Sequence, residues 1–146
     1  MEPNTVEARI RESFERQQAM ALIGAQLVQV AAGEVEIHLP FADRLTQQHG
    51  FVHAGLLSTA LDSACGYAAL TRMPEGAGVL TIEYKVNLLA PGAGDWFRLV
   101  GRVRKAGRTI SLSEGDAFAV SAAGEKLIAT MSATMMTVHG REHITN

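Results

Sequence analysis

One acidic side chain, Asp62, stands alone in a long stretch of apolar and small residues. Between Arg44 and Arg72 it is the only Asp, Glu, Lys or Arg. A carboxylate in a buried apolar helix is costly unless a partner satisfies it or chemistry uses it, and burial raises the pKa of such a group. One interpretation is an Asp that hydrogen-bonds a neighbouring backbone group or solvent near a helix end. Because the predicted position is in mid-helix, we favour a catalytic carboxylate.

The predicted helix that carries Asp62 begins at Ala54, eight residues earlier. A helix N-terminus presents free backbone N–H groups and the positive end of the helix dipole. Such groups stabilise an oxyanion where a carbonyl is attacked. Gly55 keeps the approach to these groups open, although the segment is equally compatible with an ordinary helix start.

Polar side chains crowd the approach to this helix, and each of them can hydrogen-bond a carbonyl or a water. They are Gln47, Gln48, His49 and His53. The basic residues also cluster once, because five of the 13 Lys and Arg lie within 11 positions: Arg98, Arg102, Arg104, Lys105 and Arg108. That cluster is either a solvated strand face and turn or a site for a polyanionic ligand, since Arg matches phosphate oxygens.

Other chemistry is weakly supported. Two pairs of histidines have the spacing of metal ligands, His49 with His53 and His139 with His143. Metal binding, however, requires helical geometry at the pair and a third ligand. We therefore expect no metal. Ser58 lacks the motif of a nucleophile elbow. Cys65 has no neighbouring base and is predicted to be a small buried hydrophobe.

The pattern of apolar residues predicts the elements that position these groups. Helices are expected at 5–23 and 54–71, and strands at 26–31, 34–39, 80–88, 96–105, 109–120 and 126–138. The second helix is small or apolar on every side, which indicates burial all round by a sheet curled about it. The last four strands suggest an antiparallel meander, with Gly115 as a bulge. The fold class is α+β, with one sheet and one buried helix.

Length and composition limit the alternatives. The 146 residues are 47% hydrophobic and 19% charged with a net charge of −2, which predicts a single domain over 1–146 and argues against disorder and nucleic-acid binding. Ala and Gly make up about a quarter of the chain. The mean hydropathy of +0.09 is high for so small a domain, so we expect another subunit to cover some apolar surface. The lone Cys65 and the absence of a signal peptide or membrane span favour the cytoplasm.

Taken together, these residues resemble the hot-dog-fold acyl-CoA thioesterases, specifically the PaaI-like branch. The resemblance runs from about Phe14 to Met136. The family pattern is a G-x-x-H-G-G turn, a helix, and an Asp nine residues after the His, and His53 and Asp62 have that spacing. The matching segments are 48–55, 61–64, 66–69, 81–87 with Pro91, 105–109 and 124–129.

The resemblance implies a central helix wrapped by an antiparallel sheet, and hydrolysis of an acyl-CoA thioester to free acid and CoA, with no metal or cofactor. It implies that Asp62 is the general base or nucleophile and that the Ala54 N–H polarises the thioester carbonyl. His53 would orient the substrate or help bind that carbonyl, Gln47 would position the water, and Thr81 would assist with its hydroxyl. It also implies a homodimer whose protomers share each site, often paired into a tetramer.

For the substrate, we expect Gly55 to keep the approach open and Lys105, Gly107 and Arg108 to bind CoA. The acyl group is expected to be fatty or aromatic. The expected lining is aliphatic and compatible with medium or long chains, and it consists of Leu56, Leu57, Leu61 and Met73. The chain departs from the family where Ala54 replaces the first Gly of the usual pair, and where Gln47 replaces Asn.

Two rival functions remain. A non-catalytic hot-dog module would bind acyl-CoA and regulate a partner, but such a module gains nothing from the unpaired buried carboxylate of Asp62. A hot-dog dehydratase acting on acyl-carrier protein would use a His/Glu pair in a differently spaced motif, which the sequence does not contain.

Overall fold

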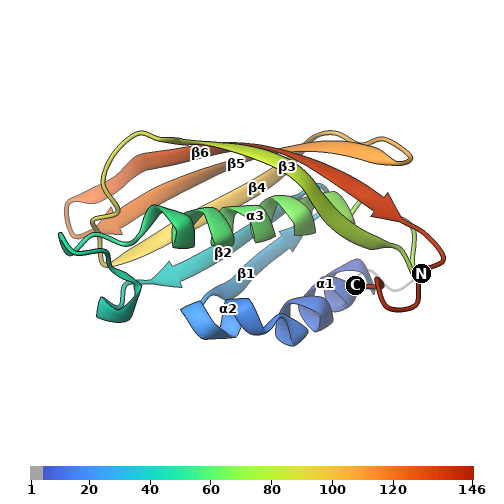
Figure 1. The fold of residues 1–146 in the computed structure, drawn as a ribbon, viewed down its shortest axis with the longest axis horizontal. Helices are drawn as coiled ribbons and strands as arrows, with labels where there is room; N and C mark the ends of the chain where they lie inside the picture. Colours follow the sequence, from blue (N-terminus) through green and yellow to red (C-terminus); the bar gives the residue numbers. More distant parts are fainter. Residues whose placement is uncertain (1–4) are drawn as a thin grey trace.

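Six antiparallel strands form one sheet, and a long helix lies along one face of it (Figure 1). The computed structural model describes residues 5–146. In chain order the elements are α1 (Thr5–Arg16), α2 (Gln18–Ile23), β1 (Gln26–Ala31), β2 (Glu34–Pro40), a 3-10 turn (Asp43–Leu45), α3 (Ala54–Leu70), β3 (Gly78–Leu88), β4 (Trp96–Lys105), β5 (Ile110–Ser121) and β6 (Gly124–Val138). The predicted helix wrapped by an antiparallel sheet is confirmed.

The strand order is β1-β2-β4-β5-β6-β3, so the predicted four-strand meander is wrong. Strands β4, β5 and β6 follow one another as hairpins, but β3 pairs with β6, from Gly78 opposite Val138 to Leu88 opposite Ala129. The seven residues 89–95 carry the chain from this edge back to β4. Seven residues reach roughly 24 Å, enough to cross three strand spacings of about 4.8 Å. Strands β1 and β3 are therefore the two edges.

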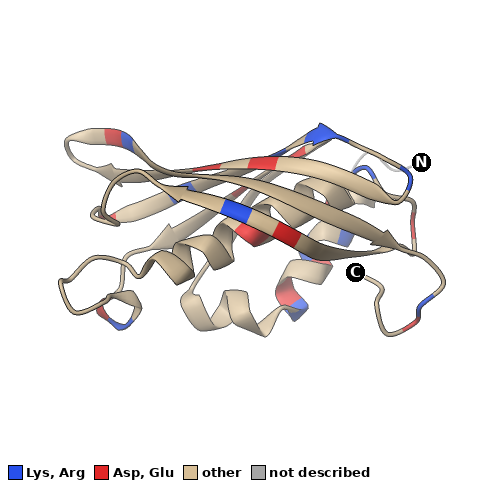
Figure 2. Ribbon diagram, turned by 45° about the horizontal axis from the view of Figure 1, so that its top comes forward, with Lys and Arg blue, Asp and Glu red and all other residues tan. Residues whose placement is uncertain are grey.

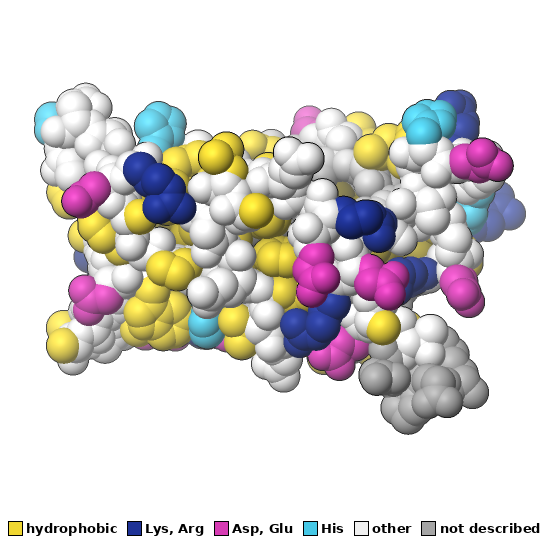
Figure 3. Space-filling model, turned by 90° about the horizontal axis from the view of Figure 1, so that it is seen from below, with side chains coloured by type: hydrophobic (Ala, Val, Ile, Leu, Met, Phe, Trp, Pro, Cys, Tyr) yellow, Lys and Arg dark blue, Asp and Glu magenta, His cyan; other side chains and the backbone are white. Residues whose placement is uncertain are grey.

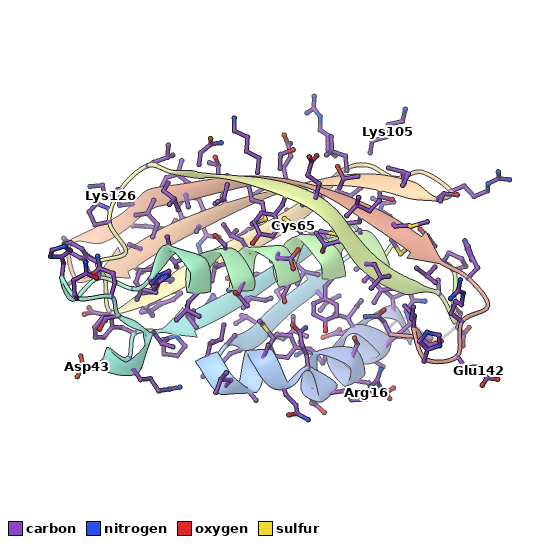
Figure 4. The ribbon with its side chains drawn as sticks, in the orientation of Figure 1. Arg16, Asp43, Cys65, Lys105, Lys126 and Glu142 are labelled. Carbon is purple, nitrogen blue, oxygen red and sulfur yellow. The ribbon has the colours of Figure 1, made fainter. Side chains whose placement is uncertain are left out.

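Two facing glycines let the sheet close tightly on α3. Gly101 of β4 pairs with Gly115 of β5. A Cβ atom at Gly101 would collide with the Ala64 carbonyl and lie 2.6 Å from the Cys65 nitrogen, and one at Gly115 would lie 2.9 Å from Cys65 Sγ. Figure 4 shows Cys65 between the helix and the sheet. Gly115 is thus a close-packing site, and the predicted bulge there is wrong because the register of β5 shifts later, between Ala117 and Phe118.

Over its second half, the long helix α3 is enclosed on all sides, as its composition predicts. Every residue from Ser63 to Leu70 is buried. Near its start, Gly55 is exposed and Ala54 is half-buried, so this end of the helix faces outward in the single chain.

The N-terminal helical region is two helices, and the single helix predicted over 5–23 is wrong. Gln17 is extended (φ −82°, ψ 99°) and separates α1 from α2. After this break Met20 and Ile23 face inward, whereas Leu22 is exposed. Figure 3 views the molecule from below, the side on which Figure 1 shows α1 and α2, and charged side chains of both signs gather toward one end of that face.

Arg9 ties α1 to the end of α3. Its guanidinium donates to the carbonyl oxygens of Leu70 at 2.8 Å, Met73 at 3.1 Å and Pro74 at 3.0 Å. Leu70 is the last residue of α3 and the other two lie in the loop after it, where a cation complements the negative end of the helix dipole. The contact holds α1 against the C-terminal end of α3 and the loop that follows it.

Candidate active site

Asp62 is half-buried on α3 and receives a hydrogen bond from β3. Thr81 Oγ1 donates to Asp62 Oδ1 at 2.7 Å. Burial raises the pKa of Asp62 above its ordinary value, and the Thr81 hydrogen bond lowers it by less. The structure thus brings together two of the predicted site residues, and it gives the carboxylate a higher proton affinity than an exposed Asp has.

A cavity of about 120 Å³ opens beside this carboxylate. Its lining is mostly polar: Gln17, Asp62, Ser63, Gly66, Tyr67, Val79, Thr81 and Asn146. None of the four aliphatic side chains expected to line the acyl path lines this cavity. Leu61 is fully buried in the core, Met73 lines a different pocket beside α1, and Leu57 lines the groove at the start of α3.

Sequence reasoning missed Gln17, Ser63 and Tyr67, which form one polar network. Ser63 Oγ donates to Gln17 Oε1 at 3.1 Å, and Gln17 Nε2 donates to the Tyr67 hydroxyl at 2.9 Å. Tyr67 also shares a 3.1 Å hydrogen bond with Ser13 of α1. The only sequence signal was the pair of polar residues at 63 and 67, one turn apart in a helix of small and apolar residues.

At the start of α3, His53 caps the helix. Its Nδ1 accepts from the Gly55 N–H at 2.9 Å, so a neutral His53 ring carries its proton on Nε2. The Leu56 N–H donates to the His53 carbonyl at 2.9 Å. Within residues 5–146 the Ala54 N–H has no acceptor, and it is therefore the unused donor of this helix terminus.

Gln47 organises the loop before the helix. Its Oε1 accepts from the His49 N–H at 2.6 Å and the Phe51 N–H at 3.3 Å. With its carbonyl engaged in this way, the Gln47 carboxamide offers a bound water only its N–H groups. A groove of about 620 Å³ runs past Gln47, His53 and Ala54 to the end of β3, where Leu88 and Leu89 line it.

The candidate residues occupy two separate places in one chain. The cavity beside Asp62 and the groove beside Ala54 share no lining residue. Eight residues of helix separate Ala54 from Asp62, or roughly 12 Å along its axis. A single chain therefore does not bring the helix N-terminus to the carboxylate.

The predicted basic cluster divides into paired and unpaired members. Arg98 lies 2.8 Å from Glu125 and 3.3 Å from Glu36, and Arg102 lies 3.1 Å from Asp116. These two arginines hold neighbouring strands together on the sheet surface. Among the described residues, Arg104, Lys105 and Arg108 have no carboxylate partner.

The unpaired cations lie at the turn between β4 and β5, which is exposed throughout 104–110. Figure 4 shows Lys105 projecting from the sheet into solvent. Gly107 shapes this turn, because a Cβ atom there would collide with the Ile110 carbonyl oxygen. Gly107 N–H also donates to Ser111 Oγ at 3.3 Å.

Burial and geometry limit the other candidates. Burial raises the pKa of the Cys65 thiol to about 12, so this sulfur is an inert core atom, as predicted. Within residues 5–146 no group of three His, Cys, Asp or Glu is placed to hold a metal ion. The helices described here are all too short or too polar to cross a membrane.

A helix enclosed by a single antiparallel sheet is the hot-dog architecture. The family model of the thioesterase superfamily matches residues 49–122, which is half of the chain and includes Ala54, Asp62 and Thr81. The chain belongs to the thioesterase superfamily.

One solved structure agrees with this assignment, and two more distant ones share the fold. A thioesterase family protein from Silicibacter pomeroyi is 47% identical, with a TM-score of 0.91 over 92% of this chain and 99% of that one. The PaaI protein from the phenylacetic acid degradation operon of E. coli shares the fold at 18% identity, with a TM-score of 0.82 over 92% of this chain and 94% of that one. A Haemophilus influenzae thioesterase, also 18% identical, matches with a TM-score of 0.78 over 86% of each chain.

Proposed function

We propose that this thioester hydrolase acts on acyl-CoA, releasing the free acid and CoA, with Asp62 as the reacting carboxylate. The observation that carries the proposal is the half-buried Asp62, held by the Thr81 hydroxyl at 2.7 Å beside a cavity. A carboxylate with a raised pKa is a stronger base than an exposed one, and the CoA thiolate is a good leaving group.

In the reaction, an oxygen nucleophile forms a bond to the thioester carbonyl carbon and the C–S bond then breaks. If Asp62 acts as general base, it takes a proton from the attacking water and returns it to the leaving thiolate. If Asp62 acts as nucleophile, a mixed anhydride forms and water hydrolyses it. Both routes use the ionised carboxylate, so both require the pH to lie above its pKa.

The thioester oxygen becomes negatively charged during the attack, and the Ala54 N–H is the donor proposed to stabilise it. This N–H lies at the positive end of the α3 dipole and has no acceptor among the described residues. His53 Nε2–H is a second donor beside it, because Gly55 occupies Nδ1. The N–H groups of Gln47 are then available to hold the water.

Since Ala54 and Asp62 lie apart in one chain, we propose that each site takes its two halves from two copies. The outer edge of β3 has no partner strand within residues 5–146, and this strand exposes Leu80, Ile82, Tyr84 and Leu88. A long apolar edge of this kind is a template for pairing with another chain. Thr81 and Asp62 lie near its beginning and the Ala54 groove lies at its end.

Antiparallel pairing of two β3 strands would bring the Asp62 end of one copy to the Ala54 end of the other. Because the pairing is symmetric, the dimer would contain two such sites. Charge favours a register with Tyr84 on the two-fold axis, because Glu83 of each copy then lies opposite Lys85 of the other. Figure 2 shows the acidic and basic segments next to each other on β3. In this register Thr81 lies opposite Asn87, and Leu80 opposite Leu88.

The phosphates of CoA are assigned to the exposed turn between β4 and β5. Lys105 and Arg108, together with Arg104, have no carboxylate partner in the described residues, whereas Arg98 and Arg102 are engaged. Exposed, unpaired cations attract a polyanion most strongly when no carboxylate competes for them. Gly107 keeps this turn in its present shape.

The test is hydrolysis of a panel of acyl-CoA thioesters by the wild type, Asp62→Asn and the control Asp95→Asn, which makes the same chemical change at an exposed residue. We expect kcat/KM to fall at least about 100-fold for Asp62→Asn and to stay unchanged for Asp95→Asn. Equal activity of Asp62→Asn and wild type would refute the role of Asp62. Tight binding of acyl-CoA without turnover by wild type would instead favour the non-catalytic module.

A further inference from the structure

The cavity beside Asp62 is small and surrounded by hydrogen-bonding groups. Six of its eight lining residues are polar, and its volume is about 120 Å³. An apolar cavity of roughly 150 Å³ holds a single benzene molecule, so the walls that one copy supplies surround only a short group. Polar walls of this kind do not favour a long aliphatic chain.

From this cavity we infer the class of acyl group: a short acyl chain whose far end carries a neutral hydrogen-bonding group such as a hydroxyl, with Gln17 as the residue that selects it. The inference rests on the proposed acyl-CoA hydrolysis at Asp62. It adds a specificity-determining residue that lies outside the residues matched by the family model, 49–122.

Gln17 is placed for this role by the break between α1 and α2. Its backbone leaves the helical conformation, and its side chain reaches α3 to join Ser63 and Tyr67, which lie one turn apart beside Asp62. One N–H and one lone pair of the carboxamide are used in these two contacts. The other N–H and the other lone pair remain, and together they match a hydroxyl group, which both donates and accepts.

The charge of the lining sets a second preference. The described cavity walls contain no Lys or Arg, and Asp62 is the one Asp or Glu among them. A carboxylate at the end of the acyl group would meet a like charge and no cation, which is unfavourable in a partly buried site. The acyl end is therefore neutral.

Gly66 supplies the open space in this cavity. A Cβ atom at Gly66 would meet only the Cε and Sδ atoms of Met135, both at 3.9 Å, which is ordinary contact. Gly66→Ala therefore narrows the cavity without a clash, and it favours the helix because Ala has the higher helix propensity. It is a steric probe that leaves the fold intact.

The experiment compares kcat/KM for butyryl-CoA, 3-hydroxybutyryl-CoA, succinyl-CoA and palmitoyl-CoA in wild type, Gln17→Met and Gly66→Ala. For wild type we expect 3-hydroxybutyryl-CoA to exceed butyryl-CoA about tenfold or more, with succinyl-CoA and palmitoyl-CoA poorer still. Gln17→Met has a similar length but lacks the carboxamide, so it should reduce the hydroxybutyryl-to-butyryl ratio about tenfold. Gly66→Ala should lower kcat/KM for both four-carbon substrates and raise the melting temperature.

Different failures separate the two proposals. If wild type hydrolyses none of the four thioesters and none of a wider panel that includes aromatic acyl-CoA, the proposed acyl-CoA hydrolysis is wrong. If it hydrolyses them but prefers palmitoyl-CoA or succinyl-CoA, or if Gln17→Met leaves the ratio unchanged, the inference about the acyl group is overturned while the function stands. Should Gln17→Met fail to fold, Gln17→Leu removes the same carboxamide with a side chain of different shape, and an unchanged ratio in that variant overturns the inference equally.

Discussion

Replacing Thr81 with Val tests whether β3 controls the proton affinity of Asp62. Thr81 Oγ1 lies 2.7 Å from Asp62 Oδ1, and 3.3 Å from Met135 Sδ, a much weaker acceptor. Within residues 5–146 no other side chain donates to Asp62. Valine has nearly the same shape as threonine and favours β-strands, so the change removes the donor while preserving β3.

The expected size of the effect on the ionisation of Asp62 follows from the charge of the carboxylate that accepts the hydrogen bond. A hydrogen bond to a charged group contributes about 1.5–3 kcal/mol, and the half-exposed position of Asp62 points to the lower end of that range. Because about 1.4 kcal/mol corresponds to a factor of ten, Thr81→Val should reduce the ionised fraction of Asp62 about tenfold at acidic pH. The pKa of Asp62, already raised by burial, rises further when the donor is lost.

The assay is the pH dependence of kcat/KM for wild type, Thr81→Val and Thr81→Ser. Activity needs ionised Asp62, so it is lost as the pH falls through the pKa, and the acidic limb of Thr81→Val should lie at higher pH. Well above both pKa values Asp62 is ionised in each protein, and the difference should vanish there. Thr81→Ser keeps the hydroxyl and should follow the wild type. An equal loss at every pH would refute the reasoning, because Thr81 would then act by some route other than the ionisation of Asp62.

Three further predictions concern the fold, the CoA site and the dimer. Gly101→Ala should destabilise the protein by about 1–3 kcal/mol, because its Cβ meets the backbone of α3, and a melting temperature equal to that of wild type would contradict this packing. Lys105→Ala combined with Arg108→Ala should raise KM for acyl-CoA several-fold but leave KM unchanged for a short thioester that lacks the nucleotide, and an equal rise for both would exclude a phosphate site. Glu83→Lys or Lys85→Glu alone should weaken self-association measured by sedimentation, and the double variant should restore it; loss in all three would exclude the proposed register.

Local sequence patterns predicted the positions of most elements and one part of the site. Asp62 was identifiable because an isolated charge in an apolar stretch is visible without any structure. The strand at 96–105 and the start of the long helix at Ala54 were placed correctly, because alternation and helical propensity are properties of neighbouring residues. The contact between Thr81 and Asp62 agrees with the resemblance, which had paired both residues with the reaction.

Long-range choices were not predictable in the same way. The sequence predicts that the consecutive strands β3 and β4 are neighbours in the sheet. Instead β3 pairs with β6, because the connection 89–95 is long enough to cross the sheet. Gln17 looked like an ordinary helical residue, since glutamine has good helix propensity. Its extended backbone depends on partners 46 and 50 residues away, Ser63 and Tyr67. Neither the pairing of β3 with β6 nor the extended backbone of Gln17 can be predicted from a short stretch of sequence.

The separation between the two halves of the site decides what the single chain can do. A reacting carbonyl must lie within about 3 Å of its hydrogen-bond donor and of the attacking oxygen. The Ala54 N–H and the Asp62 carboxylate are on one rigid helix, roughly 12 Å apart along the axis, so no motion of a side chain brings both to the same carbonyl. The exposed apolar edge of β3 runs between these two ends. The proposed pairing of that edge with a second copy would remove the edge from water and complete both sites at once, so the same contact would set both the stability of the dimer and its activity.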